Sequence, residues 1–597
     1  MGADYFRLRA AAPAEAGLLT DLVLRSKAAW GYDQTFLDTW REQLRIRPDE
    51  VLPRRTVVAD RDGTPVGVAT LDGRPPYGEI GLLFVDPPDM HHGIGQALYR
   101  HVLTEAGRLG FHRLTIDADP HAVAFYRRLG AEPVPGSEPP GPGELVRMQA
   151  WPPTPDPSWS AAWTGGPGRP IVVGNAAEFN AQFGGRPRGP DHYSCLAVFG
   201  ADRPATVLLP MPVDDWWTGH VSEILGWTDT EVISGLADDG RMDAAIGGSP
   251  TLTRRIAAGR RQVRPWGWTP GLAAIALCPD DVVRAMRKYE SKSKANALFH
   301  ALAADHPGIA VLDQREITSF RRLKRELAHN GRMVLKRRHG VGGAGTLIVS
   351  ADTPDLRRQV WDWMYGGALL EEFVEGDPAH RDVTFDAVVA ADGWVHPVGT
   401  GLMHVETTAY RGVTVGPGVL PDDVARIAGA FGVAVGQALA AAGYRGWYDV
   451  DFVATTSGRL TPTEINLRLT GPSAAFHIQA ALDRERGGRH IVRTVDQLRL
   501  GARLPSAALR EHVARLTEHC ASLDATLLVT IPTAAFDAAP YLGVALAART
   551  VQAVTDAETA VRQAATALGD IFRDTELSPG DGRTGRTPPA SRRPASA

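Results

Sequence analysis

The sequence has few of the residues that mark three classes of protein. Only three of its 597 residues are cysteines, and Cys195, Cys278 and Cys520 lie too far apart for a zinc site or a disulfide framework. The 64 Lys and Arg residues nearly balance the 68 Asp and Glu residues, so no basic excess points to nucleic acid. We find no apolar run of spanning length and no signal-peptide core. We therefore expect a cytoplasmic protein without nucleic-acid or membrane partners.

The length predicts several domains, because a single hydrophobic core rarely grows beyond ~250–300 residues. The composition shifts to Pro, Gly, Ser and Trp between residues 151 and 170, which indicates a linker. We expect a multidomain α/β and α+β fold. Its predicted parts are an α/β unit at 1–150, the linker at 151–170, an α/β unit at 171–280, a larger unit at 281–505, an extension at 506–573 and a disordered tail at 574–597.

A turn between a strand and a helix is the main chemical feature of the first unit. The apolar segment Glu79–Val85 predicts one strand, two prolines end its pairing, and His91–Gln96 then opens an amphipathic helix. Free N–H groups at such a helix start bind anions. After a further strand at Arg113–Asp117, a second helix presents Tyr126.

These features resemble the GCN5-related N-acetyltransferases, over nearly all of residues 1–150. LFVDPPDMHHGIGQAL is similar to the acyl-CoA pyrophosphate loop of that family, and DPHAVAFYRRLGA to its second signature. The family usually has Gln or Arg where this chain has Met90. The resemblance implies acetyl-CoA as cofactor, with Tyr126 as the acid that protonates the thiolate and Glu79 as the base. It assigns the pyrophosphate to the backbone at His91, Gly93, Gly95 and Gln96.

Ordinary structural roles stay open for the same residues. Tyr126 is also typical of a core tyrosine, and Glu79 of an exposed carboxylate on a strand. His91 and His92 lack a third ligand nearby, which argues against a metal there.

Residues 171–280 are typical of a small doubly wound sheet. Three short apolar segments predict its strands, at Ile171–Val173, Cys195–Phe199 and Thr206–Leu209. Loops after such strands commonly bind ligands, so Asn175 and Gly267–Gly271 are candidate substrate contacts.

The segment from Asp449 to Arg468 carries the strongest chemical signal. Apolar and polar residues alternate on both sides of Ser457-Gly458, which predicts a hairpin. A symmetric turn would place Asp451 opposite Glu464 and Asp449 opposite Asn466 on one face, because side chains alternate along a strand.

Opposed carboxylates repel unless a cation lies between them. A set of Asp451, Glu464 and Asn466 offers only oxygen ligands of the kind that Mg²⁺ or Mn²⁺ prefers. Arg468, on the same face, would then reach phosphates that the metal carries. The alternative is a solvated hairpin face.

Two features upstream of this hairpin suit a phosphate chain. A basic helical stretch at Arg284–Leu302 contains Lys288, Lys292 and Lys294. A strand ending at Lys336 leads into the loop GVGGAG at Gly340–Gly345, whose glycines permit a close approach of the backbone to phosphate. The loop lacks the GK[ST] ending of a Walker motif.

In this order the features resemble the ATP-grasp superfamily from about Lys288 to Pro505, and Ile171–Pro279 is similar to the domain that precedes it. The resemblance implies ATP and Mg²⁺ or Mn²⁺ as cofactors. The segment beginning at Leu527 is similar to the C-terminal extension of pheganomycin-type peptide ligases. Carried over by position, the nucleotide contacts are Lys294, Lys336, Gly342, Gly343, Glu372, Val374 and Asp382, the metal ligands are Asp451, Glu464 and Asn466, and Arg468 steadies an acyl-phosphate.

Together the resemblances imply a bifunctional enzyme of specialised metabolism. One part would join small carboxylates to amines, such as amino acids or peptides, and the other would be an acyl-CoA-dependent N-acetyltransferase. Arg411 is a candidate for binding the substrate carboxylate, with a surface role as the alternative. Two other interpretations stay open, an acyl-CoA synthetase with a regulatory acetyltransferase and a ligase controlled by a non-catalytic acyl-CoA sensor. The sequence allows a homodimer.

Overall fold

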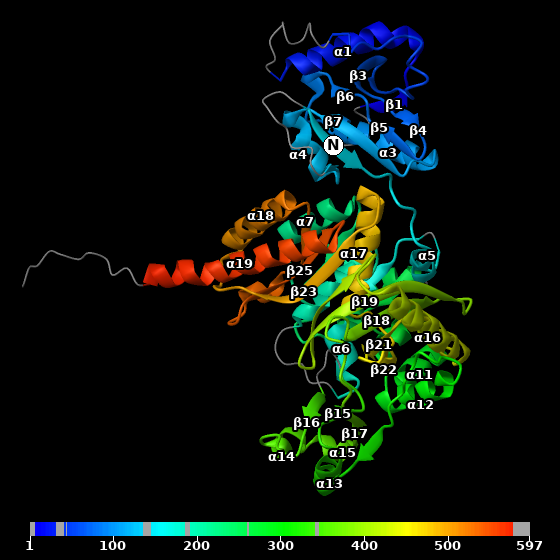
Figure 1. Ribbon diagram of the computed structural model, residues 1–597, viewed down its shortest axis with the longest axis vertical. Helices are drawn as coiled ribbons and strands as arrows, with labels where there is room; N and C mark the ends of the chain where they lie inside the picture. The colour runs from blue at the N-terminus through cyan, green and yellow to red at the C-terminus, as the bar shows by residue number, and fades with distance from the viewer. Residues whose placement is uncertain are drawn as a thin grey trace, which may run out of the picture.

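The computed structural model describes residues 6–30, 41–42, 44–134, 145–166, 168–184, 191–259, 262–340 and 345–576, without the side chains of 365 and 570–576. The molecule is elongated, with the first unit at one end, a large sheet in the middle and a small lobe at the other end (Figure 1). The predicted multidomain α/β and α+β organisation is confirmed. Gly342, Gly343 and most of the predicted tail lie outside the described residues.

The first unit contains two sheets. One has the strand order β1-β2-β3-β6, and the other the order β4-β5-β7-β9-β8 with β5 and β7 parallel. Its elements are β1 (Arg7–Ala10), α1 (Ala16–Ala28), β2 (Val57–Arg61), β3 (Thr64–Ala69), β4 (Asp72–Arg74), β5 (Tyr77–Glu79), β6 (Leu83–Val85), α3 (Ile94–Arg108), β7 (Arg113–Ala118), α4 (Val123–Arg128), β8 (Glu132–Pro133) and β9 (Val146–Ala150).

The prediction of one strand at Glu79–Val85 is wrong, because the segment changes sheets. β5 ends at Glu79 in one sheet, and β6 begins at Leu83 in the other. Between them lies Gly81, where an added Cβ would come 1.9 Å from the Asp72 carboxylate. A side chain at this crossing would have to displace those of Asp72 and Arg54, and a continuous apolar pattern does not reveal the crossing.

The second unit contains a parallel sheet of order β12-β11-β10-β13. The predicted strand at Cys195–Phe199 is instead a 3₁₀ helix, η4 (His192–Phe199). All residues from Ser194 to Phe199 are buried, and an apolar run buried on every side has no period that separates strand from helix. The other elements are α5 (Ser158–Thr164), β10 (Ile171–Val173), α6 (Ala176–Ala181), β11 (Thr206–Leu208), α7 (Asp215–Leu225), β12 (Glu231–Ile233), α8 (Met242–Gly248), α9 (Pro250–Ala258), β13 (Val263–Pro265) and α10 (Pro270–Ala276).

The small lobe is an antiparallel sheet of order β14-β17-β15-β16 with helices beside it. The helical stretch predicted before it is two helices, α11 (Asp280–Tyr289) and α12 (Lys292–Ala303), which are separated at Glu290 and Ser291. The lobe consists of β14 (Arg315–Ile317), α13 (Phe320–Asn330), β15 (Met333–Arg337), β16 (Thr346–Val349), α14 (Leu356–Val360), α15 (Trp363–Gly366) and β17 (Ala368–Glu372).

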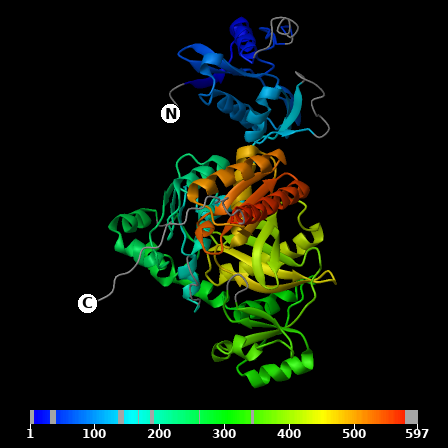
Figure 2. The ribbon, with the colours of Figure 1, turned by 90° about the vertical axis from the view of Figure 1, so that its left-hand side faces the viewer.

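The large sheet has the order β22-β21-β18-β19-β20-β23-β25-β24. Figure 2 shows its yellow and orange part between the first unit and the small lobe. Its last two strands come from the predicted extension, so the sheet continues across the boundary predicted at residue 505. Its elements are β18 (Asp382–Val389), β19 (Val395–Glu406), β20 (Ala409–Val415), α16 (Asp422–Ala441), β21 (Gly446–Ala454), β22 (Leu460–Asn466), α17 (Gly471–Arg486), β23 (Ile491–Arg499), α18 (Ser506–Ser522), β24 (Thr526–Ile531), β25 (Tyr541–Ala548) and α19 (Val551–Glu576).

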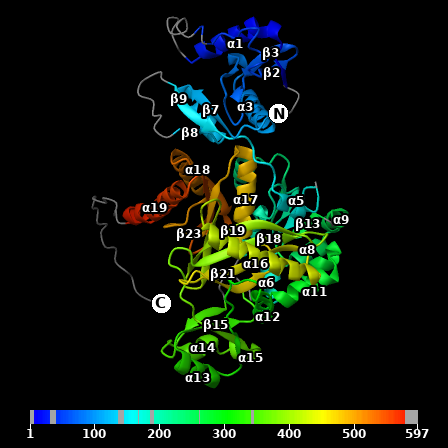
Figure 3. The same ribbon diagram turned by 45° about the vertical axis from the view of Figure 1, so that its right-hand side comes forward.

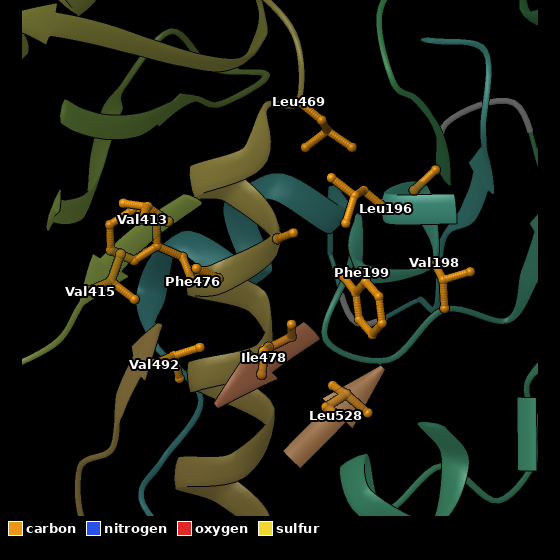
Figure 4. Packing of buried hydrophobic residues seen from close by; sticks show 14 of the residues in the cluster. Leu196, Val198, Phe199, Val413, Val415, Leu469, Phe476, Ile478, Val492 and Leu528 are labelled. Atoms are coloured by element: carbon orange, nitrogen blue, oxygen red, sulfur yellow. The ribbon is translucent and has the colours of Figure 1, made fainter. Parts of the chain in front are cut away.

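Helix α17 lies in the core and reaches towards the first unit at its C-terminal end (Figure 3). Figure 4 shows Phe476 of this helix beside Val413 and Val415 of β20, with Leu196 and Phe199 of η4 on the other side of the helix. Buried contacts on both sides fix its position. Its first turn is therefore held firmly where Gly471 and Pro472 line a cavity.

Helix α16 is, within the described chain, the one helix long and apolar enough to cross a membrane by length and composition. The sequence analysis expected no segment to meet that test. Phe431, Val435 and Leu439 of α16 are fully buried, and the helix packs against β18 and β19. Core helices commonly satisfy the same criterion.

Candidate functional site

A cavity of about 1650 Å³ is lined by residues of the second unit, the small lobe and the large sheet. Most of the residues that the sequence analysis assigned to nucleotide and metal meet in its wall. They are Lys336, Glu372, Val374, Asp382, Asp451, Glu464, Asn466 and Arg468. Strand pairing brings together segments that are far apart in the chain, and this convergence is what the resemblance predicted.

The hairpin has the predicted register at the end that lines the cavity. Asp451 pairs with Glu464 and Asp449 with Asn466. Nearer the turn, however, Phe452 pairs with Pro462, because a β-bulge shifts the register after Asp451. The turn is therefore not centred between Ser457 and Gly458 as predicted. The bulge shifts the strands by one residue, so that Asp451 still lies opposite Glu464.

Three aspartates of neighbouring strands, Asp386, Asp449 and Asp451, lie close together at this end of the sheet. Asp386 of β18 lies opposite Asp449 of β21, and both are buried. Asp449 accepts hydrogen bonds from Asn466 Nδ2 at 2.7 Å and Thr470 Oγ1 at 2.7 Å, and Asp386 accepts one from Trp447 Nε1 at 2.8 Å. Burial raises the pKa of Asp449 well above its usual value, and repulsion from Asp451 and Asp386 adds to this rise.

Asp451 has the free oxygen that a metal would need. Its Oδ1 atom is buried without a hydrogen-bond partner among the described residues, while Oδ2 accepts a bond from Asn466 at 3.3 Å. Burial raises the pKa of Asp451 to about 6. An orphaned carboxylate oxygen next to Glu464 and Asn466 fits a divalent cation with oxygen ligands.

The metal set contains only two acids, since its third member is Asn466. Across the described residues, no group of three or more His, Cys, Asp or Glu side chains is close enough to hold a metal ion. Glu464 instead pairs with the ammonium group of Lys292. Ligation through Glu464 would therefore require this ion pair to loosen.

Three buried cations line the same cavity. Lys336 pairs with Glu371 at 2.7 Å, Arg468 Nη1 donates to both carboxylate oxygens of Glu290 at 2.8 and 3.0 Å, and Lys292 contacts Glu464. Burial, with the charges of Lys336 and Arg468, lowers the pKa of Lys292 to about 7. Three cations held close together suit a ligand with several negative charges.

The residues predicted near adenine and ribose lie on the lobe side of the cavity. Glu372 at the end of β17 and the following Phe373 and Val374 line it, and Asp382 begins β18. Burial raises the pKa of the Asp382 carboxyl. An apolar backbone segment beside a carboxylate is suited to a base and a sugar hydroxyl.

Two of the assigned residues, Lys294 and Arg411, lie outside the cavity wall. Lys294 is exposed and does not line the cavity, whereas Lys292 does, because α12 begins at Lys292 and directs alternate lysines apart. Arg411 is also outside the wall, since its guanidinium bonds Glu406 at 2.9 Å and Gln497 at 2.5 Å. Of the candidate contacts in the second unit, the Asn175 amide donates to the Gly267 carbonyl at 2.8 Å and is fully buried.

The sequence analysis named Lys292 in the basic stretch but assigned the nucleotide contact to Lys294, and it missed Glu290. Glu290 bonds Arg468 and the Leu467 N–H at 2.7 Å, and this contact lies at the break between α11 and α12. A Glu-Ser pair ahead of a lysine was the available signal, because serine favours a helix start. It was read as the middle of one helix.

The first unit positions the predicted acyl-CoA turn as expected. His91 and Gly93 adopt positive φ of 65° and 80°, and α3 then begins at Ile94. The first N–H groups of that helix, including those of Gly95 and Gln96, have no partner within the helix. An added Cβ on Gly95 would lie 3.4 Å from the Phe125 ring, so the turn lies against the segment that carries Tyr126.

Tyr126 is buried, with ring contacts to Tyr99 at 5.8 Å and Phe125 at 5.1 Å. Burial raises its pKa well above the usual value, so the hydroxyl keeps its proton. Burial also raises the pKa of Glu79, helped by Asp117, which suits a base. No contact described for Glu79 joins it to Tyr126.

Residues 21–131 match the family model described as the Acetyltransferase (GNAT) family. This agrees with the resemblance drawn for the first unit. The match spans less than a quarter of the chain, so it describes that unit alone. No curated protein sequence matches the chain.

Solved structures resemble both parts. An N5-carboxyaminoimidazole synthase from Aspergillus clavatus, in complex with ADP and 5-aminoimidazole ribonucleotide, is 16% identical with a TM-score of 0.41, covering 68% of this chain and 99% of its own. A biotin carboxylase from Campylobacter jejuni is 12% identical with a TM-score of 0.41, covering 68% and 96%. A GCN5-related N-acetyltransferase from Rhodopseudomonas palustris is 23% identical with a TM-score of 0.22, covering 25% and 97%. At these values no chemistry is transferred to this chain.

Proposed function

We propose that the protein is a bifunctional enzyme, an ATP-dependent carboxylate–amine ligase joined to an N-acetyltransferase. The ligase proposal depends on one observation. A single cavity gathers three buried cations, a carboxylate with a free buried oxygen and an apolar segment beside a second carboxylate. Triphosphate, metal ion and nucleoside each find suitable groups there.

The chemistry follows from the weak electrophilicity of a carboxylate. Transfer of the γ-phosphoryl group from ATP to the carboxylate makes an acyl-phosphate, and an amine then displaces phosphate. Arg468 is the residue that would steady the negative charge spread over the phosphoryl oxygens, because Glu290 holds its guanidinium in place. Its Nε atom has no hydrogen-bond partner among the described residues, so it keeps a donor for a ligand.

A divalent cation would be held by Asp451, Glu464 and Asn466. When bound, it supplies positive charge to the phosphates and a fixed template for them. Lys292 would then exchange Glu464 for phosphate oxygens, which relieves the charge crowding around its buried ammonium. Lys336 is held by Glu371, which in turn accepts a hydrogen bond from Gln314 Nε2 at 2.5 Å.

For the first unit we propose acyl transfer from acetyl-CoA to an amine. The helix start at Ile94 would bind pyrophosphate with backbone N–H groups, which Met90 leaves unchanged. Tyr126 would protonate the departing thiolate. A non-catalytic acyl-CoA sensor has the same backbone cradle but does not require Tyr126.

A phosphate-release screen tests the ligase proposal. The purified full chain is incubated with ATP, Mg²⁺ and amino acids or dipeptides as carboxylates, with hydroxylamine as a small nucleophile. We expect phosphate, ADP and a hydroxamate from at least one carboxylate. A rate of phosphate release that is the same with and without a carboxylate, or formation of AMP in place of ADP, would contradict the proposal.

A further inference from the structure

A second group of polar side chains lines the cavity without a part in the nucleotide proposal. Asp496 and Gln497 of β23 both face it, and so do Tyr193, Tyr410 and Tyr541. These residues come from the second unit, the large sheet and its last strands. They combine one acid with aromatic rings, unlike the cation-rich group around Arg468.

A β-bulge explains how two consecutive residues of one strand line the same cavity. In a regular strand Asp496 and Gln497 would point to opposite faces. The pairing of β23 with β25 shifts register between Val495 and Leu498, so both residues lie in the irregular stretch. Bulges of this kind re-aim side chains and are common beside active sites.

Asp496 is a buried carboxylate that forms no ion pair with any residue that the structure describes. Asp496 is only 4% exposed, and its Oδ2 atom has no hydrogen-bond partner among the described residues. Burial raises the pKa of Asp496 to about 7, while Tyr193 opposes this rise. Burying an unpaired carboxylate is costly, which favours a role with a cationic ligand.

The surroundings of Asp496 connect it to the phosphoryl site. Tyr193 lies near enough to both Asp496 and Arg468 for its hydroxyl to be affected by both charges. Its ring meets that of Trp266 edge-on at 5.6 Å. On another side lies Tyr410, whose hydroxyl is also buried without a partner among the described residues and would be 2.4 Å from an added Cβ on Gly471.

We propose that Asp496 binds the ammonium group of the acceptor amine and accepts its proton, and that the surrounding rings select primary amines that carry an apolar or aromatic group. This rests on the ligase function proposed above. A charged donor and a carboxylate form a short, strong hydrogen bond, and aromatic faces attract a cation.

The proposed step is balanced as follows. One proton of the ammonium passes to the Asp496 carboxylate, which frees the nitrogen lone pair. That pair forms a C–N bond to the carbonyl carbon of the acyl-phosphate, and the C–O bond to phosphate breaks with its electrons on oxygen. The leaving phosphate takes the second proton from nitrogen, and Asp496 releases the first to solvent.

The test compares two nucleophiles in one variant, Asp496→Asn, which keeps the shape of the side chain. Amino acid amides, led by phenylalaninamide, can act only as amines because their carboxyl group is blocked. Hydroxylamine is uncharged at neutral pH and small enough to need no ammonium site. We expect kcat/KM for the amide to fall about a hundredfold and hydroxamate formation to change less than about threefold. Asp423→Asn, an exposed acid on α16, is the matched control.

Each outcome has a definite meaning. Equal losses with both nucleophiles would show a structural role and overturn the inference, and so would an unchanged rate with phenylalaninamide. Hydroxamate formation in Asp496→Asn also reports that the variant is folded. Calorimetric binding of phenylalaninamide to the full chain with ATP adds a measurement independent of turnover, and binding equal in wild type and Asp496→Asn overturns the inference. Absence of hydroxamate in the wild type instead counts against the ligase function itself.

Discussion

The glycine turn of the first unit and the large cavity obtain their ligand-binding groups in opposite ways. The turn uses consecutive residues, His91 to Gln96, and offers backbone N–H groups. The cavity uses side chains from α12, β15, β21, β22 and β23, which meet only after the large sheet has formed. One site is local in sequence, and the other depends on tertiary structure.

This difference predicts how each site responds to substitution. A backbone site should tolerate a change of side chain, such as Met90, provided that the positive φ values remain accessible. A site of buried, paired charges tolerates little, because removal of one partner leaves the other uncompensated. The largest effects should therefore come from the cavity.

The largest loss is expected for the proposed metal ligands. In Asp451→Asn or Glu464→Gln, carboxylate-dependent phosphate release should fall about 10³-fold, because the charge that holds the metal beside the phosphates is reduced. Phosphate release is measured over a Mg²⁺ titration, in which a higher Mg²⁺ requirement supports ligation. Unchanged turnover and Mg²⁺ dependence in both variants would remove these residues from the site.

Stability and function should separate at the Lys336–Glu371 pair. Both side chains are less than a tenth exposed, so Lys336→Met leaves a buried carboxylate and should lower the free energy of unfolding by roughly 3 kcal/mol. Adding Glu371→Gln should restore most of that stability, but ATP-dependent turnover should stay lost. Chemical denaturation and phosphate release measure the two quantities. Recovery of turnover in the double variant would show that Lys336 is structural.

The sequence predicted the local parts of the molecule well. The strand before the glycine loop was found, since β15 includes Lys336, and the hairpin register was correct where Asp451 meets Glu464. The agreement at that end depended on a bulge compensating for a longer turn, which no pattern showed. Periodicity reports which face is buried, not where a strand slips by one residue.

The remaining failures have a common physical origin in tertiary contacts. The break between α11 and α12 occurs where Glu290 bonds Arg468, and this contact decided that Lys292 rather than Lys294 enters the cavity. Asp496 could not be recognised as a site residue, since its orientation follows from a bulge between β23 and β25. Such positions require the fold before their chemistry can be read.

A smaller effect is expected in the first unit. Tyr126→Phe should lower thiol release from acetyl-CoA about 10²-fold, because the departing thiolate loses its proton donor. The raised pKa of Tyr126 keeps it protonated at ordinary pH, so wild-type activity should not decline at alkaline pH through this group. Tyr99→Phe is the matched control, since the Tyr99 hydroxyl is buried without a partner among the described residues. A sensor without catalysis would show no thiol release in any variant.

The smallest effect should appear where the two regions meet. Arg549, which follows β25, donates to Glu132 of the first unit at 3.2 Å and to the Arg486 carbonyl at 3.0 Å. Burial raises the pKa of Glu132 from 4.5 to about 7, with Arg549 opposing the rise. The folded protein thus holds a proton that the unfolded chain releases, so this contribution is complete below pH 4.5 and is lost as pH rises through 7. In Glu132→Gln, the decline in unfolding free energy between pH 4.5 and 8 should be smaller by roughly 1–3 kcal/mol.

Asp483, whose pKa burial also raises to about 7, adds to the decline in both proteins. Glu511→Gln, an exposed change on α18, should leave the profile unaltered, and an equally steep decline in Glu132→Gln would mean that Glu132 is ionised at this interface.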